Sequence, residues 1–279
     1  MASPRSSMTV RRIGPERDAV LASLGELWAS GGLVRAVTLR EIRVRYKQTL
    51  LGVAWAVTHP LMLMLIFTVI FSRFVRVGSD GFPYPLFSYC ALLPWTFIAN
   101  SSNLSMNCLV ANVELVTKVW FPREALPIAS VVASLLDFSI AMLLLLGLFV
   151  WFGHVPGLTA LYLLPLIVLQ LALTLGIAFL VSAASVRYRD FKFIVPLGLQ
   201  VWMYGSPIIY PLSKVPEALQ PYYRLNPMVG LIEGYRSALL RGAAPDLELT
   251  AIAALGAALV LCQGWLYFHH EEKYFADVI

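Results

Sequence analysis

Long apolar stretches set the strongest limit on what this chain can fold into. A helix needs about 20 mainly apolar residues to cross the roughly 30 Å hydrocarbon core of a bilayer. Five stretches meet that requirement plainly: Val53 to Phe71, Ile128 to Phe152, Leu158 to Val181, Phe193 to Leu212 and Thr250 to Phe268. We therefore expect an all-α integral membrane protein. The composition agrees, because 59% of the residues are hydrophobic and only 13% are charged.

A sixth stretch, Leu86 to Val110, is apolar as far as Ala99 and then continues into Asn100 and further small polar residues. The basic residues decide in favour of a span. With six spans and a cytoplasmic N-terminus, 15 Lys and Arg residues fall on the cytoplasmic side and six on the outer side, as the positive-inside rule requires. If Leu86 to Val110 were not a span, the loop that holds Arg187 and Arg189 would lie outside. We predict spans at about 53–71, 86–110, 128–152, 158–181, 193–212 and 250–268, with both termini in the cytoplasm.

The basic excess is confined to residues 1–52. This leader holds nine basic and four acidic residues, which accounts for the whole net charge of +5. The remaining residues balance at 12 and 12, so the charge pattern does not indicate a nucleic-acid partner. No unbroken apolar core marks a cleavable signal peptide in the first 30 residues. We therefore predict a cytoplasmic leader at 1–52 and a transmembrane domain at 53–279.

The leader itself has helical periodicity. Apolar residues share one face in its first part: Val20, Leu24, Leu27 and Trp28. This pattern is typical of an amphipathic helix that lies on the membrane surface. A second helical stretch, from Leu33 to Thr49, carries a stripe of Leu39, Ile42 and Tyr46 among several basic residues. From periodicity alone, a juxtamembrane anchor for anionic lipid and a functional role are equally open for those basic residues.

Several kinds of catalytic or metal site are not indicated. No lysine follows a glycine, so the Gly-Lys-Ser/Thr end of a P-loop is missing. The four histidines lack metal-ligand spacing, and the three cysteines form no Cys-x-x-Cys motif. Asp137 is the only acidic residue deep in an apolar run, which is too little for an ion relay. A buried acid held by its neighbours and a functional acid both remain open for it.

Motifs that follow one another along the chain resemble the permease subunits of ABC-2 type polysaccharide exporters. The resemblance covers roughly Leu33 to Ile279, and its motifs stand at span ends. They are RVRYKQTLLG at Arg43–Gly52, LPW at Leu93–Trp95, VWFPRE at Val119–Glu124, VRYRD at Val186–Asp190, PIIYP at Pro207–Pro211, LNPMV at Leu225–Val229, EGYR at Glu233–Arg236 and FADVI at Phe275–Ile279.

The resemblance implies a six-span subunit of a bacterial cytoplasmic membrane. Such a subunit pairs with a second copy of itself and binds two ABC ATPase subunits. Together they export lipid-linked polysaccharide of the O-antigen, capsule or teichoic-acid type. ATP and Mg²⁺ would then bind the partner ATPase, and this chain would need no cofactor and no catalytic residue.

Two sets of residues are predicted to contact the substrate. By resemblance, the first is an entrance for an anionic lipid head, and arginine suits the forked contacts of a phosphate. It comprises Arg43, Arg45, Tyr46 and Lys47. The second is a channel lining, because sugar rings stack their CH faces on aromatic planes. It comprises Trp55, Trp95, Phe97, Trp202 and Tyr204.

Two further sets are predicted to move. The loop between spans two and three resembles a coupling helix, with Phe121 and Arg123 against the ATPase. Its residues are Glu114, Lys118, Phe121, Pro122, Arg123 and Glu124.

Repeated prolines after span five favour re-entrant or surface helices on the outer side. There, Glu233 and Arg236 are spaced to pair on one helix face. By resemblance this region is an outer gate, made of Asn226, Pro227, Glu233 and Arg236.

Two alternatives stand beside the exporter. One is an ABC-2 permease for a small hydrophobic compound, which would need a drier and less aromatic path without a basic entrance. The other is an integral-membrane glycosyl- or acyltransferase, which would place acidic or His residues together at one membrane face.

Overall fold

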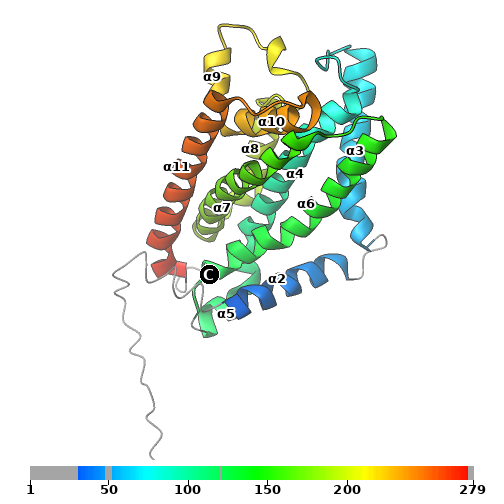
Figure 1. Ribbon diagram of the computed structural model, residues 1–279. Helices are drawn as coiled ribbons and strands as arrows, with labels where there is room; N and C mark the ends of the chain where they lie inside the picture. Colours follow the sequence, from blue (N-terminus) through cyan, green and yellow to red (C-terminus); the bar gives the residue numbers. More distant parts are fainter. Residues whose placement is uncertain (1–30, 48–51, 120, 276–279) are drawn as a thin grey trace, which may run out of the picture.

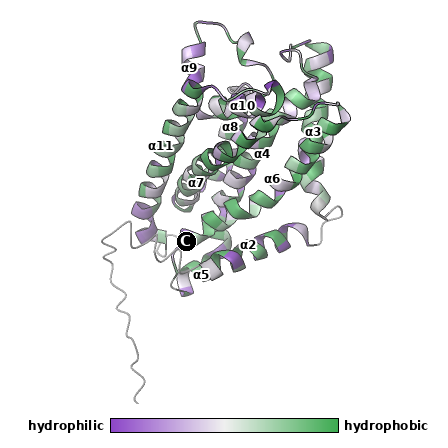
Figure 2. Ribbon diagram, in the orientation of Figure 1, coloured by the Kyte–Doolittle hydropathy of each residue, from purple (hydrophilic) through white to green (hydrophobic). Residues whose placement is uncertain are grey.

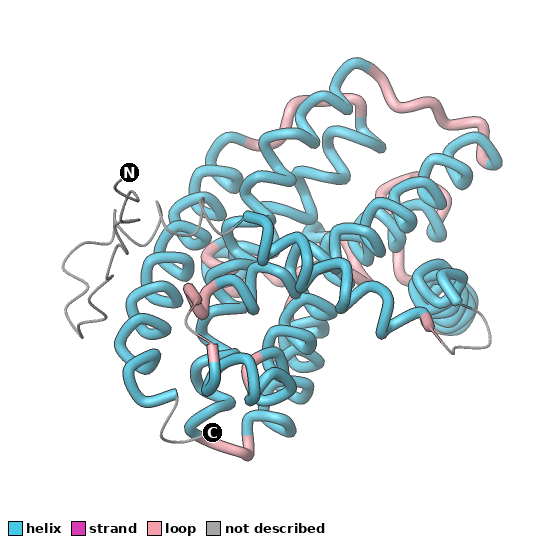
Figure 3. The backbone as a smooth tube through the Cα atoms, turned by 90° about the horizontal axis from the view of Figure 1, so that it is seen from below, coloured by secondary structure: helices cyan, strands magenta, loops and turns pink. Residues whose placement is uncertain are grey.

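The computed structural model describes residues 31–47, 52–119 and 121–275. Within them the chain is helical and contains no strand (Figure 3), so the predicted all-α fold class is confirmed. The α-helices are α2 (Gly31–Tyr46), α3 (Trp55–Phe67), α4 (Tyr84–Cys108), α5 (Val113–Lys118), α6 (Ala125–Trp151), α7 (Leu163–Arg187), α8 (Phe191–Tyr204), α9 (Gln220–Arg224), α10 (Pro227–Arg236) and α11 (Leu247–Glu271). One π-helical segment extends α3 over Thr68–Phe74, and another extends α10 over Ser237–Arg241.

Four described helices are long and apolar enough to cross a membrane. They are Trp55–Phe74, Ala125–Trp151, Leu158–Arg187 and Leu247–Tyr274. These correspond to the first, third, fourth and sixth predicted spans. Figure 2 shows their middle parts as mainly hydrophobic, whereas hydrophilic residues gather near the ends of the bundle.

The other two predicted spans differ in length and polarity. Helix α4 has 25 residues, which is long enough, but its second half carries Asn100 and Asn103, and most of its side chains are buried. Helix α8 has 14 residues and ends at Tyr204, before the predicted boundary at Leu212. As a helix boundary, Leu212 is wrong: the helix ends at Tyr204, and Pro207, which has no backbone N–H to donate, stands just beyond that end. The count of six spans therefore stays a prediction.

Small residues bring α7 and α11 into close contact. A Cβ atom added to Gly264 would lie 2.2 Å from the backbone oxygen of Gly176, so only glycine fits at this crossing. The same device joins α10 to α11, where a Cβ atom on Gly230 would lie 2.4 Å from the backbone oxygen of Leu249. Close backbone approach of this kind is how membrane helices gain packing contacts that apolar side chains alone do not provide.

Helix α2 lies across one end of the bundle, beneath α6 (Figure 1). The predicted helix from Leu33 is thus present as far as Tyr46, and its buried residues are not those of the predicted stripe. Val37 and Thr38 are buried, with Val34 packed beside them, whereas Leu39 of the predicted stripe is 40% exposed. The face is selected by the contact with α6 and not by lipid alone. The predicted surface helix around Val20 to Trp28 lies outside the described residues.

The connection between α8 and α11 folds at the opposite end of the bundle (Figure 1). Asn226 caps α10, because its Oδ1 accepts a hydrogen bond from the backbone N–H of Met228 at 3.0 Å, and Pro227 occupies the first helical position. The residues of α10 after Pro227 are all buried. Short helices are thus present where re-entrant helices are predicted, and their relation to the membrane stays a prediction.

Candidate functional site

A cavity of about 470 Å³ lies between α2, α3, α4 and α6. Its lining combines a cation, a carboxylate, amide groups and aromatic rings. The lining residues are Arg45, Tyr46, Trp55, Ala56, His59, Pro60, Thr96, Phe97, Asn100, Asn103, Leu104, Asp137, Phe138 and Ala141. This mixture suits a ligand that is both charged and hydroxylated, because aromatic planes and hydrogen-bonding side chains stand side by side.

Asp137 connects α6 to α2 at the wall of this cavity. The Nη1 atom of Arg45 forms an ion pair with Asp137 Oδ2, and the Tyr46 hydroxyl donates a hydrogen bond to Asp137 Oδ1. Burial, together with the neighbouring Asp137, raises the pKa of Tyr46 to about 12. The hydroxyl therefore remains protonated, and remains a donor, throughout the physiological pH range.

The predicted entrance residues separate into two groups. Arg45 and Tyr46 line the cavity, whereas Arg43, on another face of α2, and Lys47, just after the end of the helix, are exposed. The sequence left the role of Asp137 open, and it did not predict that Asn100 or Asn103 would line the cavity. The signal for Asp137 was its isolation in an apolar run, since a membrane carboxylate needs a partner.

The predicted aromatic lining is also divided. Trp55 and Phe97 line the cavity. Trp95 and Trp202 pack edge to face, with ring centroids 5.5 Å apart, and the Trp202 Nε1–H donates to Asn226 Oδ1 at 3.0 Å. Tyr204 is 51% exposed near the end of α8. The cavity therefore gathers only part of the set that the sequence grouped together.

The predicted outer gate is a buried polar network. The expected Glu233–Arg236 pair is confirmed, with Arg236 Nη1 lying 3.0 Å from Glu233 Oε1. Arg236 is 1% exposed, donates to the carbonyl oxygens of Pro207 and Ile208, and stacks 3.6 Å from the centroid of the Phe87 ring. Arg241 contacts the second Glu233 oxygen at 2.8 Å. The network holds the segment after α8 onto α10, and its role as a gate stays a prediction.

The predicted coupling segment has an exposed part and a buried part. On α5, Glu114 and Lys118 form an exposed pair at 3.3 Å. Phe121 and Pro122 are buried, and Phe121 packs in a core cluster that also holds Phe268 and Phe275. Phe121 therefore faces the interior of its own chain, and its side chain is not exposed for direct contact with another subunit.

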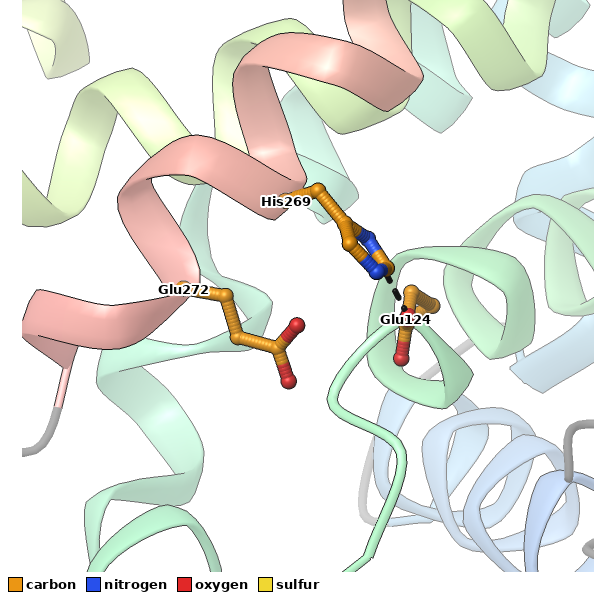
Figure 4. A group of neighbouring side chains, drawn as sticks. All are labelled: Glu124, His269 and Glu272. Carbon is orange, nitrogen blue, oxygen red and sulfur yellow. Dashed lines mark ion pairs between the residues drawn. The ribbon is translucent and has the colours of Figure 1, made fainter. Parts of the chain in front are cut away.

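The end of the coupling segment is attached to the C-terminal part of α11. Arg123 donates to the backbone oxygen of Glu272. Glu124 is fully buried, and one of its carboxylate oxygens lies 3.5 Å from His269 Nδ1. Figure 4 shows these side chains with Glu272 beside them. Residues 123 and 124 are thus in direct contact with the end of α11 and the residue that follows it.

Glu124, His269 and Glu272 offer ligand atoms that all lie within 4.8 Å of one another. They could share a divalent cation, and the Glu124–His269 contact also stands as an ion pair without one. The sequence indicated no metal ligands, because Glu124 is far from the other two. His269 and Glu272 are three residues apart at the end of one helix, which is the only signal that reading the sequence could have used.

Known proteins resemble this chain over most of its length. The model of the ABC-2 type transporter family matches residues 32–240. The O-antigen export system permease protein RfbA of Myxococcus xanthus is 30% identical over 252 residues, which cover 89% of this chain and 96% of the relative. The protein of the same name from Klebsiella pneumoniae is 27% identical, covering 88% and 95%. The polysialic acid transport protein KpsM of Escherichia coli is 28% identical, covering 75% and 81%.

Proposed function

The chain belongs to the ABC-2 type transporter family, and from this premise we propose that it is the transmembrane subunit of an ATP-driven exporter of lipid-linked polysaccharide. It is a multi-pass protein of the bacterial cytoplasmic membrane. The relatives that match most of its length are named as export or transport proteins for O-antigen and polysialic acid. A polysaccharide cargo is therefore the first expectation.

One structural observation gives this proposal its strongest support. The cavity between α2, α3, α4 and α6 places Arg45 beside the aromatic rings of Trp55 and Phe97 and the amides of Asn100 and Asn103. A guanidinium suits a phosphate, while aromatic rings and amides suit a sugar. A lipid-linked glycan has its phosphate next to its first sugar, which matches this juxtaposition.

Energy must come from a partner, because no lysine of this chain stands in a P-loop sequence. We assign ATP and Mg²⁺ to a separate ABC ATPase subunit and propose that a pair of these subunits binds a homodimer of this chain. The exposed face of α5, with Glu114 and Lys118, supports the placement of that contact. Exposed aromatic residues such as Trp55 and Tyr204 support a channel lining that a second copy completes.

Gene deletion and complementation in the source bacterium test the function. We expect that cells without this chain lose surface polysaccharide and accumulate the lipid-linked form inside. Complementation should require the intact partner ATPase, and a partner whose P-loop lysine is replaced should fail. Normal surface polysaccharide in the deletion strain would contradict the proposal.

Neither alternative gains support from a specific observation. A path for a small hydrophobic compound would be dry, whereas the cavity holds Arg45, Asp137 and two asparagines. A membrane-bound glycosyl- or acyltransferase is disfavoured because the matching relatives are named as permease or transport proteins.

A further inference from the structure

Asp137 forms contacts that a bound anion would also form. Its two carboxylate oxygens are shared between the guanidinium of Arg45 and the hydroxyl of Tyr46. These two donors come from neighbouring positions at the end of α2, whereas Asp137 comes from α6. The carboxylate thus occupies the anion position of a site whose donors both belong to the predicted entrance segment.

The site is accessible from the cavity and is not filled by Asp137 alone. Arg45 and Asp137 keep 23% and 13% of their side-chain surface exposed, and both line the cavity of about 470 Å³. The Nη2 atom of Arg45 is buried and makes no hydrogen bond within the described residues. A buried guanidinium nitrogen without an acceptor is costly, so an anion with more acceptor oxygens than a carboxylate would satisfy Arg45 better.

A phosphate group has that chemistry. In a lipid-linked sugar each phosphate is a diester with one negative charge, so a diphosphate head carries two. Either head offers more acceptor oxygens than a carboxylate and binds a guanidinium through two parallel hydrogen bonds. The aromatic rings of Trp55 and Phe97 and the amides of Asn100 and Asn103 lie around the same cavity. The surroundings therefore provide for a sugar attached to the phosphate.

We propose that Asp137 is an internal counter-ion that holds the Arg45 site in the empty transporter, and that the phosphate or diphosphate head of a lipid-linked sugar displaces it. The inference rests on the proposed function and deepens it by naming the group that the substrate must replace. Displacement releases the end of α2 from α6, so that occupation of the cavity and movement of α2 are one event. Asp137 is in this sense a positioning residue, which acts through Arg45.

Binding measurements on the purified full chain with its partner ATPase in lipid nanodiscs test this. The probes are a lipid with a diphosphate-linked sugar, the matching glycolipid without phosphate, and inorganic pyrophosphate. Asp137→Asn removes the competing charge while its amide oxygen still accepts the Tyr46 hydrogen bond. We expect Asp137→Asn to bind the diphosphate lipid about tenfold more tightly than the wild type, and Arg45→Gln to bind it at least tenfold more weakly.

The controls separate this role from a merely structural ion pair. Neither substitution should change affinity for the glycolipid without phosphate, and Arg35→Gln, which alters an exposed arginine of α2 away from the cavity, should change none of the affinities. If Asp137→Asn is not recovered folded, Asp137→Ser supplies a second neutral variant. Weaker or unchanged binding of the diphosphate lipid by a folded neutral variant would overturn the proposal, even where the wild type exports polysaccharide normally. Equal affinity for pyrophosphate and the lipid would overturn the assignment to a lipid head group.

Discussion

Arg236 is a charged side chain that is almost completely buried. Its guanidinium is 1% exposed: Nη1 and Nη2 donate to Glu233 and to two backbone carbonyl oxygens, and the Phe87 ring lies against it, whereas Nε has no hydrogen-bond partner within the described residues. Removing one partner of a buried ion pair leaves the other charge without compensation. Substitution of Arg236 would therefore act mainly through the buried groups that it leaves without a partner: the Glu233 carboxylate on α10 and the two carbonyl oxygens after α8.

We expect Arg236→Ala to destabilise the folded chain by about 3–5 kcal/mol. The measurement is the midpoint of thermal unfolding in detergent, followed by the yield of folded protein. Arg224→Ala is the matched control, because Arg224 pairs with Glu248 at a solvent-exposed position, where an ion pair contributes little. Equal midpoints for the two variants would contradict the account of the buried network.

The basic residues of the entrance segment should differ in their effects. Arg45 faces the cavity and pairs with Asp137, whereas Arg43 and Lys47 are exposed. Neutralising all three should abolish export more than it lowers membrane insertion, and Arg45→Gln alone should account for most of the loss. Surface polysaccharide and the amount of inserted protein are measured in parallel for the single and triple variants. Equal losses of export and insertion would favour a role in anchoring and topology alone.

At the scale of the element, the helices could be predicted well where apolar length alone decides. The spans at 53–71, 128–152, 158–181 and 250–268 all fall on apolar helices. The sequence predicted too long a helix after Phe193, because its apolar residues continue through Gly205 and Pro207 although the backbone does not. Hydropathy records the solvent preference of side chains, whereas the end of a helix depends on backbone constraints.

The site was predictable only in part, for a related reason. The residue types of the entrance and of the aromatic lining could be selected from their chemistry. Their grouping depends on which helix faces meet, and Arg45 and Asp137 are far apart in sequence. Periodicity grouped Leu39 with Ile42 and Tyr46 on one stripe of α2, whereas Leu39 is exposed and contact with α6 buries Val37 and Thr38. Which side chains of α2 lie against α6 can therefore be determined only from the tertiary structure.

The coupling segment offers a test that distinguishes contact from support. Glu114 and Lys118 are exposed on α5, while Phe121 is 7% exposed within a core cluster. We expect Glu114→Ala combined with Lys118→Ala to lower co-purification of the ATPase without changing the unfolding midpoint. Phe121→Ala should instead destabilise the chain by about 3–5 kcal/mol, as the loss of a buried phenyl ring does. Loss of the ATPase from a Phe121→Ala variant with an unchanged midpoint would restore Phe121 to the contact surface.

The crossing of α7 and α11 is equally testable. Gly264→Ala would place a Cβ atom 2.2 Å from the backbone oxygen of Gly176, so the two helices must separate and α11 should lose its packing. We expect a marked fall in the unfolding midpoint and in folded yield. Gly147→Ala on α6 is the control, because nothing lies within 4 Å of the added atom and alanine favours helix. Similar midpoints for the two variants would show that the crossing is not fixed by these glycines.

At the scale of the whole molecule, both ends of the described chain lie at one end of the bundle. Val37 of α2, Val116 of α5 and Phe275 near the C-terminus pack in a single cluster, and Figure 1 shows α2, α5 and the end of α11 at the same end of the bundle. The connection from α8 to α11 lies at the other end. The distribution of basic residues predicts that the first end is cytoplasmic. If so, the coupling segment, the entrance segment and the C-terminal part of α11 share the compartment that holds ATP.

Cysteine labelling tests this orientation directly. Glu217→Cys lies in the exposed connection after α8, and Lys118→Cys lies at the exposed end of α5; Cys90 and Cys108 are buried and Cys262 is exposed. In a background where Cys262 is replaced by Ser, a membrane-impermeant thiol reagent should label Glu217→Cys in intact spheroplasts. Lys118→Cys should react only after the membrane is opened, because the reagent cannot cross it. Labelling of Lys118→Cys in sealed spheroplasts, with Glu217→Cys protected, would reverse the topology and would place the entrance segment, the cavity and α5 on the side that has no ATP.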